Sequence, residues 1–181
     1  TDLTADRASQ WAFKLDAQLN LLDQQGKKHG TLQQFLANPE RHQIPLLTIN
    51  NEATLNPLAK IANQVDLTDI SLRSSHDGLL RKAHMLMPAT RTVLDLSSNK
   101  KLSSSRDGLA AILHRTNRAF SRIVILPDYM INKENVSFLQ QRLLSVWGES
   151  TARSLDSAGR VLAAGLNAII TTQSEHYNAI L

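Results

Sequence analysis

The segment TRTVLDLSSNKKLSSSRDGLAAILHRTNRAFSRIVILPDYMI, residues 90–131, decides the fold class of this chain. Two short runs rich in Val, Ile and Leu enclose a turn that carries Ser and Lys and one amphipathic stretch. Strand, turn, helix and strand over about 40 residues form a βαβ unit, because two parallel strands need a crossover of a dozen or more residues. We therefore expect an α/β protein.

The residues on either side extend this unit into a larger sheet. Apolar runs that alternate with helical patterns predict a doubly wound, mostly parallel sheet of about four to five strands, RecA-like or Rossmann-like, with flanking helices. The expected strands cover 44–49, 66–73, 92–96 and 122–126. The expected helices cover 56–65, 76–87 and 104–121, with Asn56 and Ser75 as the caps of the first two.

The first 43 residues are expected to form a helical lead-in. A helix over 4–28 would start at a cap on Asp6 and end at Gly26, and a short second helix would lie between Thr31 and Pro39. The first of these predictions depends on four apolar residues at helical steps, namely Trp11, Leu15, Leu19 and Leu22.

The chain after the sheet also shows helical spacing. Residues 132–147, with Asn132 as the cap, and residues 154–170 are both predicted to be helices. We accordingly divide the chain into the lead-in at 1–43, an α/β core at 44–131 and C-terminal helices at 132–181 that complete the same domain.

Composition limits the function classes. With 42% hydrophobic and 20% charged residues among 181, the chain belongs to the globular range. The absence of Cys excludes disulfides, thiolate zinc sites and a cysteine nucleophile. No apolar run approaches the roughly 18 to 20 residues of a membrane helix, and the first residues do not resemble a signal peptide. We expect a cytoplasmic location, no membrane insertion, and, since the chain begins without Met, a part of a larger protein.

The motifs of nucleotide and acyl chemistry are missing. The loop at 50–56 follows the first core strand but has neither the glycines nor the Lys of a phosphate-binding loop. GxGxxG and GxSxG do not occur. His76, Asp77 and His84 could suggest a metal site. The two histidines are eight residues apart, which is more than one turn of a helix, and the sequence places no third ligand, so no metal site is assigned. We assign no cofactor and no catalytic residue.

Two acidic residues keep an enzymatic alternative open. Asp95 and Asp128 both follow expected strands, and ligands of such sheets lie beyond the carboxyl ends of the strands. The alternative is a structural role for both: Asp95 as a turn residue and Asp128 as the residue that ends a strand.

Positive charge collects around the crossover. The chain has a net charge of +4 and a pI near 9.6. Six cations against Asp107 alone lie between positions 100 and 122, and these are the candidate nucleic-acid contacts: Lys100, Lys101, Arg106, Arg115, Arg118 and Arg122. A solvated helix face gives the same pattern.

The run TVLDLSSNKKLSSSRDGLAAILHRTNRAFSRIVILPD resembles the Walker-B half of a RecA-like helicase domain. It is similar, more narrowly, to the degenerate RecD-like domain of the conjugative relaxase-helicases of F-type plasmids. The resemblance covers roughly residues 44–130 and implies a domain without ATP hydrolysis that binds single-stranded DNA and is recognised by the secretion machinery. The missing phosphate loop and the missing second acid after Asp95 agree with this implication.

The sequence thus leads to one hypothesis and a rival. The hypothesis is a non-enzymatic, helicase-like domain that binds single-stranded DNA within a larger protein of DNA processing in conjugative transfer. The rival is a protein-interaction module that docks a partner through its C-terminal helices, where small residues at 158–165 allow close packing.

Overall fold

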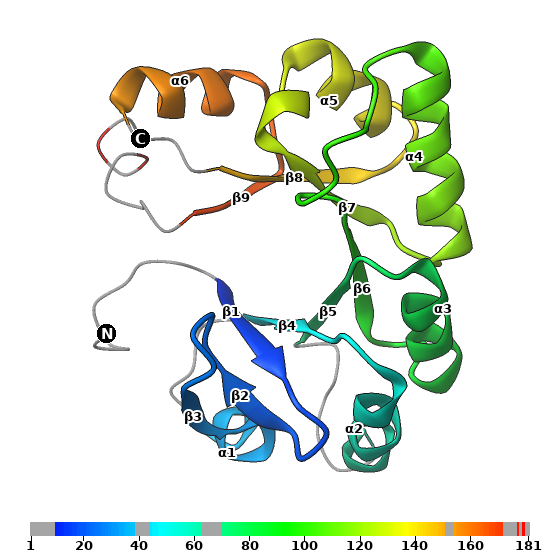
Figure 1. The fold of residues 1–181 in the computed structure, drawn as a ribbon, viewed down its shortest axis with the longest axis vertical. Coiled ribbons are helices and arrows are strands. Elements are labelled where there is room, and N and C mark those ends of the chain that lie inside the picture. The colour runs from blue at the N-terminus through cyan, green and yellow to red at the C-terminus, as the bar shows by residue number, and fades with distance from the viewer. Residues whose placement is uncertain are drawn as a thin grey trace. The chain divides into compact units, whose positions relative to one another are not determined.

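The computed structural model describes residues 10–38, 44–62, 70–150 and 154–171, together with positions 177 and 179. The chain divides into two compact units, Thr1–Thr92 and Val93–Leu181. Within the described residues there are nine strands and six α-helices (Figure 1). None of the described helices is long and apolar enough to cross a membrane.

The first unit contains a five-stranded sheet in the order β3-β2-β1-β4-β5. Strands β1, β4 and β5 are parallel, whereas β2 and β3 extend the sheet as an antiparallel hairpin. Its elements are β1 (Gln10–Leu15), β2 (Asn20–Leu22), β3 (Lys28–Thr31), α1 (Leu32–Leu36), β4 (Ile44–Thr48), the 3₁₀ turn η1 (Glu52–Thr54), α2 (Leu55–Ile61), β5 (Ser71–Ser74) and α3 (Asp77–Leu86).

The predicted helix over 4–28 is wrong. Its described part forms β1 and β2, since Phe13 and Leu15 are buried on one face at the period of a strand. Leu19 has a φ of 59° in the turn between the two strands, and Gly26, with a φ of 85°, lies in the next turn rather than at a helix end. The predicted cap Asp6 lies outside the described residues.

The helix caps of this unit are partly as predicted. Thr31 caps α1 through a reciprocal pair of hydrogen bonds with Gln34, as expected, while Pro39 lies outside the described residues. The caps predicted at Asn56 and Ser75 are wrong. Helix α2 already begins at Leu55, and its 3₁₀ start η1 leaves no capping position at 56. Helix α3 has His76 at the capping position.

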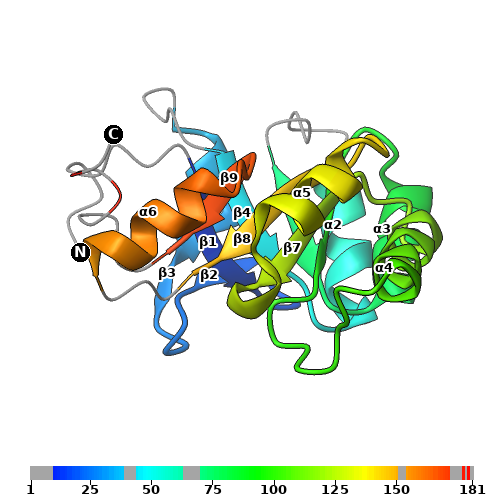
Figure 2. The same cartoon turned by 90° about the horizontal axis from the view of Figure 1, so that it is seen from above.

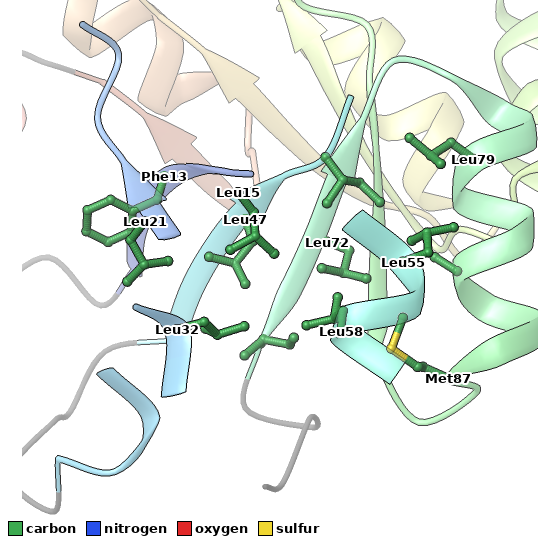
Figure 3. Close-up of a cluster of buried hydrophobic side chains, with 13 residues drawn as sticks. Phe13, Leu15, Leu21, Leu32, Leu47, Leu55, Leu58, Leu72, Leu79 and Met87 are labelled. Carbon is green, nitrogen blue, oxygen red and sulfur yellow. The ribbon is translucent and has the colours of Figure 1, made fainter. Parts of the chain in front are cut away.

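The core of the first unit lies between the sheet and its helices (Figure 3). Alternate residues of the strands, such as Leu47 and Leu72, lie on the face of the sheet that packs against Leu58 of α2. Within each strand, the neighbours of these core residues therefore lie on the opposite face of the same sheet.

The second unit has a sheet of four parallel strands in the order β6-β7-β8-β9. Figures 1 and 2 show α5 and α6 along the same side of β8 and β9. The elements are β6 (Arg91–Asp95), which starts in the last residues of the first unit, α4 (Arg106–Arg118), β7 (Ile123–Pro127), the 3₁₀ turn η3 (Asp128–Met130), α5 (Lys133–Gln140), β8 (Ser145–Glu149), α6 (Leu155–Ala163) and β9 (Ala168–Ile170).

The βαβ unit is confirmed here as β6, α4 and β7. Asn132 caps α5 as predicted, because its side chain accepts a hydrogen bond from the N–H of Asn135. The two predicted C-terminal helices are too long. The first stops before β8 and the second before β9.

The α/β class and the mostly parallel sheet are therefore confirmed, but the finer prediction is wrong. The described residues contain more strands than the expected four to five. Within each unit every parallel strand adds on the same side of the one before it, in the order β1-β4-β5 and β6-β7-β8-β9. A doubly wound sheet would reverse direction at a switch point. This one-directional order is that of β/α barrels, and not of RecA-like sheets.

Candidate functional site

The carboxyl ends of the parallel strands are the place where a fold of this kind builds its sites. In the first unit three polar side chains lie in one row there. Lys14 of β1 pairs in register with Thr48 of β4, and Thr48 pairs with Arg73 of β5. Adjacent strands are about 4.8 Å apart, so the backbones at Lys14 and Arg73 are separated by roughly 10 Å.

This row faces away from the hydrophobic core. The sequence neighbours Leu15, Leu47 and Leu72 belong to the core cluster, so strand alternation turns the row to the other face. Lys14 is exposed, and its Nζ donates to the carbonyl oxygen of Gln24 at 3.2 Å. Two cations and a hydroxyl across three strands form a surface that suits an anion, with Arg73 able to bind two oxygens at once.

Asp16 follows Lys14 at the end of β1, but its carboxylate is engaged in a turn. Its oxygens accept hydrogen bonds from the N–H of Gln18 at 2.9 Å and from the N–H and Nδ2 of Asn20 at 2.8 Å each. Burial raises the pKa of Asp16, but the hydrogen bonds from Asn20 and Gln18 and the charge of Lys28 outweigh it and lower the pKa overall. Asp16 therefore stays ionised and holds the turn in place.

In the second unit three acidic residues lie at the carboxyl ends of adjacent strands. Asp95 ends β6, Asp128 follows β7 and Glu149 ends β8. A Cβ at Gly148 would collide with side chains of Ile131 and Leu166, in the connections next to α5 and α6, so Gly148 faces the helices. Asp95 and Glu149 have the opposite alternation and lie on the other face.

These acids do not form a tight cluster. Asp128 Oδ1 lies 3.4 Å from the hydroxyl of Ser150, and Asp95 Oδ1 accepts from the N–H of Ser97 at 2.9 Å. Among the residues that the structure describes, no three His, Asp or Glu side chains gather as a metal site would require. His76 and His84 lie at opposite ends of α3, about 12 Å apart by helical rise.

The six predicted nucleic-acid contacts fall into two groups. Lys100 and Lys101 lie in the loop after β6, and Arg106 is the first residue of α4. Tyr129 holds that loop, since its hydroxyl accepts from the N–H of Leu102 at 2.9 Å and donates to a backbone oxygen of Asn99 at 2.8 Å. The other three are found at the far end of α4, where Arg115 and Arg118 belong to its last turn and Arg122 precedes β7.

These two groups lie at opposite ends of a helix of 13 residues, which is about 18 Å long. The structure thus does not bring the six cations together in one surface. Sequence reasoning missed Lys14, Thr48 and Arg73, because β1 was taken for part of a helix. The alternation of Ala12, Phe13, Lys14 and Leu15 was the available signal.

Three solved structures show what the fold is similar to. A candidate glycerophosphodiester phosphodiesterase from Galdieria sulphuraria matches with a TM-score of 0.70 at 13% identity, over 90% of this chain and 68% of that one. A phosphodiesterase from Oleispira antarctica, solved in complex with its product sn-glycerol-3-phosphate, matches with 0.67 at 17%, over 86% and 63%. A glycerophosphodiester phosphodiesterase from Agrobacterium tumefaciens matches with 0.62 at 8%, over 95% and 87%.

At these identities the likeness shows the fold alone, which is TIM-barrel-like. The chain spans only about half to two thirds of several of the matched proteins, with 53% of a glycerophosphoryl diester phosphodiesterase structure from Silicibacter pomeroyi and 63% of the Oleispira structure. No protein-family model matches the sequence, and comparison with the curated proteins finds no similar sequence.

These findings correct the resemblance drawn from residues 44–130. The RecD-like helicase assignment is wrong, and with it the inferred roles in single-stranded DNA binding and conjugative transfer. The strand, Lys-bearing turn, helix and second strand of that segment occur in any parallel α/β fold. The missing phosphate loop at 50–56 therefore marks a different fold and not a helicase that has lost ATP hydrolysis.

Proposed function

We propose that the chain is a phosphodiesterase-type domain that binds phosphodiesters of the glycerophosphodiester class at the carboxyl edge of its first unit. The observation that carries the proposal is the row of Lys14, Thr48 and Arg73, in register across three parallel strands. The phosphodiesterase fold of the three matched structures supports the same ligand class.

The chemistry of the row fits a phosphodiester monoanion. The guanidinium of Arg73 can donate to two phosphate oxygens, and the ammonium of Lys14 supplies a second cation within reach of the same group. Thr48 lies between them and offers a hydroxyl that donates or accepts. The other face of the sheet beneath the row is packed core, so the backbone needs no rearrangement to bind the ligand.

Calorimetric titration tests the proposal with sn-glycerol 3-phosphate and glycerophosphocholine as ligands. We expect both to bind, and the double variant Lys14→Gln/Arg73→Gln to lose about tenfold or more in affinity, since each charge-assisted hydrogen bond contributes about 1.5–3 kcal/mol. The control is Lys60→Gln, which removes an exposed cation from α2 in the same unit.

Two results would contradict the proposal. One is the absence of binding to the wild-type chain at millimolar ligand and low salt. The other is an equal loss of affinity in the Lys60→Gln control, which would show a general effect of net charge instead of a site at the strand ends.

Hydrolysis is a second candidate function, favoured by the three acidic residues at the carboxyl ends of β6, β7 and β8. A carboxylate can take the proton of an attacking water, and a carboxyl can give one to the leaving alkoxide. Release of choline from glycerophosphocholine measures this reaction. We expect Asp95→Asn and Asp128→Asn each to lower the rate by about a hundredfold or more.

A further inference from the structure

Helices α4 and α5 end in the same backbone motif. In α4 the N–H of Ser121 donates to the carbonyl oxygen of Thr116 at 2.9 Å, and in α5 the N–H of Leu144 donates to that of Leu139 at 3.3 Å. The residue before each donor, Phe120 or Leu143, has a left-handed backbone, with φ of 51° and 63°. Glycine usually occupies this position because it has no Cβ to strain.

Both left-handed residues are also large, apolar and exposed. The exposed fraction is 52% for Phe120 and 79% for Leu143, and the value for Leu143 is the highest among the large hydrophobic residues described. Backbone strain and solvent-exposed apolar surface are both unfavourable, and a glycine would avoid both. Their coincidence at two equivalent positions points to a function outside the fold.

The two residues belong to neighbouring connections at one edge of the sheet. Strands β7 and β8 are adjacent and parallel, with Ile123 in register with Ser145. At the start of these strands, the N–H of Ser145 donates to the carbonyl oxygen of Arg122 at 2.8 Å. Phe120 and Leu143 therefore both lie at the amino edge of the second unit, opposite the edge that carries the acidic residues.

Positive charge surrounds them. Arg118, Arg122 and Arg142 are exposed, and Arg142 lies 3.6 Å from the centre of the Phe138 ring. No acidic residue occurs in 113–127 or 137–148, whereas the acids of these helices stand in their first turns. Cations at helix C-termini stabilise the helix dipole, but that does not account for the exposed Phe120 and Leu143.

We propose that this amino-edge patch, formed by Phe120, Leu143, Arg118, Arg122 and Arg142, binds the surface of anionic lipid membranes. Phe120 and Leu143 enter the interface between headgroups and acyl chains, while the arginines pair with lipid phosphates. The excess of arginines favours an anionic partner over a neutral or cationic one. The apolar residues stand on exposed connections, and a fluid interface accepts such protruding side chains without the matching pockets that a folded protein would need.

Vesicle co-sedimentation of the full chain tests the proposal, with phosphatidylcholine vesicles that contain or lack 30% phosphatidylglycerol. We expect binding to the anionic vesicles alone, weaker at higher salt. Phe120→Gly/Leu143→Gly should lower the binding by at least about tenfold because the apolar anchors are gone, and each of Arg118→Gln, Arg122→Gln and Arg142→Gln by about fivefold. Glycine fits the left-handed backbone, so the double glycine variant keeps its fold.

A matched control is Leu155→Ser. Leu155 is as exposed as Phe120, at 52%, and lies in the same unit but next to Asp156. We expect this variant to bind vesicles like the wild type. Three results would overturn the proposal: no binding of the wild-type chain at low salt, undiminished binding of the double glycine variant, or equally tight binding to soluble polyglutamate, which would assign the patch to acidic proteins.

Discussion

The side chain of Asn135 donates a hydrogen bond from Nδ2 to the hydroxyl of Ser104 at 2.9 Å and a second to the carbonyl oxygen of Met130 at 3.0 Å. Asn135 is only 2% exposed. It thereby fixes the loop before α4 to the start of α5, and the carboxyl edge of the second unit depends on this link.

We expect Asn135→Ala to lower the free energy of unfolding by about 1–3 kcal/mol, because the buried carbonyl of Met130 loses its partner. Urea denaturation measures the change. Asn117→Ala, at an exposed position of α4, is the control and should stay within about 0.5 kcal/mol of the wild type. Equal effects of the two substitutions would contradict the structural role of Asn135.

Gly108 in the first turn of α4 lies against Ser103, and a Cβ there would collide with the backbone carbonyl oxygen of that residue. We therefore expect Gly108→Ala to destabilise the chain by about 1–3 kcal/mol, the usual cost of overpacking. Gly159→Ala in α6 is the matched helical substitution, with open space around the new methyl. It should stabilise by about 0.5–1 kcal/mol, and thermal unfolding that ranks the two variants in the reverse order would refute this packing.

Asp16 makes stability depend on pH. Because its pKa is lowered in the folded chain, the carboxylate stabilises the fold above its unfolded pKa of about 3.9. This contribution disappears as the pH falls through the lower folded-state pKa. We expect Asp16→Asn to be less stable than the wild type at pH 7, with a smaller difference at about pH 2. Urea midpoints at both pH values measure this, and a difference that persists undiminished in acid would rule the mechanism out.

Leu143→Gly should raise the free energy of unfolding by about 1 kcal/mol, since it relieves a left-handed backbone and removes little buried surface. The comparison is Leu144→Gly at the next position, where the side chain is 5% exposed. That variant should lose about 3 kcal/mol or more. If Leu143→Gly destabilised the chain to a similar extent, the residue would have a packing role and its exposure would need another explanation.

The sequence predicted best where strand and helix patterns did not overlap. The strands at 92–96 and 122–126 are continuous apolar runs between clear turns, and the structure has them as β6 and β7. Trp11, Leu15, Leu19 and Leu22 instead happen to match a helical stripe across a strand, a turn and a second strand. The alternation of a strand is visible only at Phe13 and Leu15, and two residues were too few to outweigh the helical match.

Strand β8 was missed for a physical reason. A helix end is usually marked by glycine or proline, but the left-handed residue that follows the end of α5 at Gln140 is Leu143, so the predicted helix ran on into residues 145–147. The row of Lys14, Thr48 and Arg73 could not be predicted either. It exists only through the register of three strands, one of which was assigned to a helix.

The five residues of β7 set the amino edge and the acidic edge of the second unit about 17 Å apart. A domain adsorbed through Phe120 and Leu143 would hold Asp128 that far above the lipid phosphates, facing the water. A diester still anchored by its acyl chains would remain out of reach. If the acidic edge hydrolyses diesters as proposed, adsorption would favour water-soluble diesters already released from the bilayer, because the diesters within the membrane would lie beyond its reach.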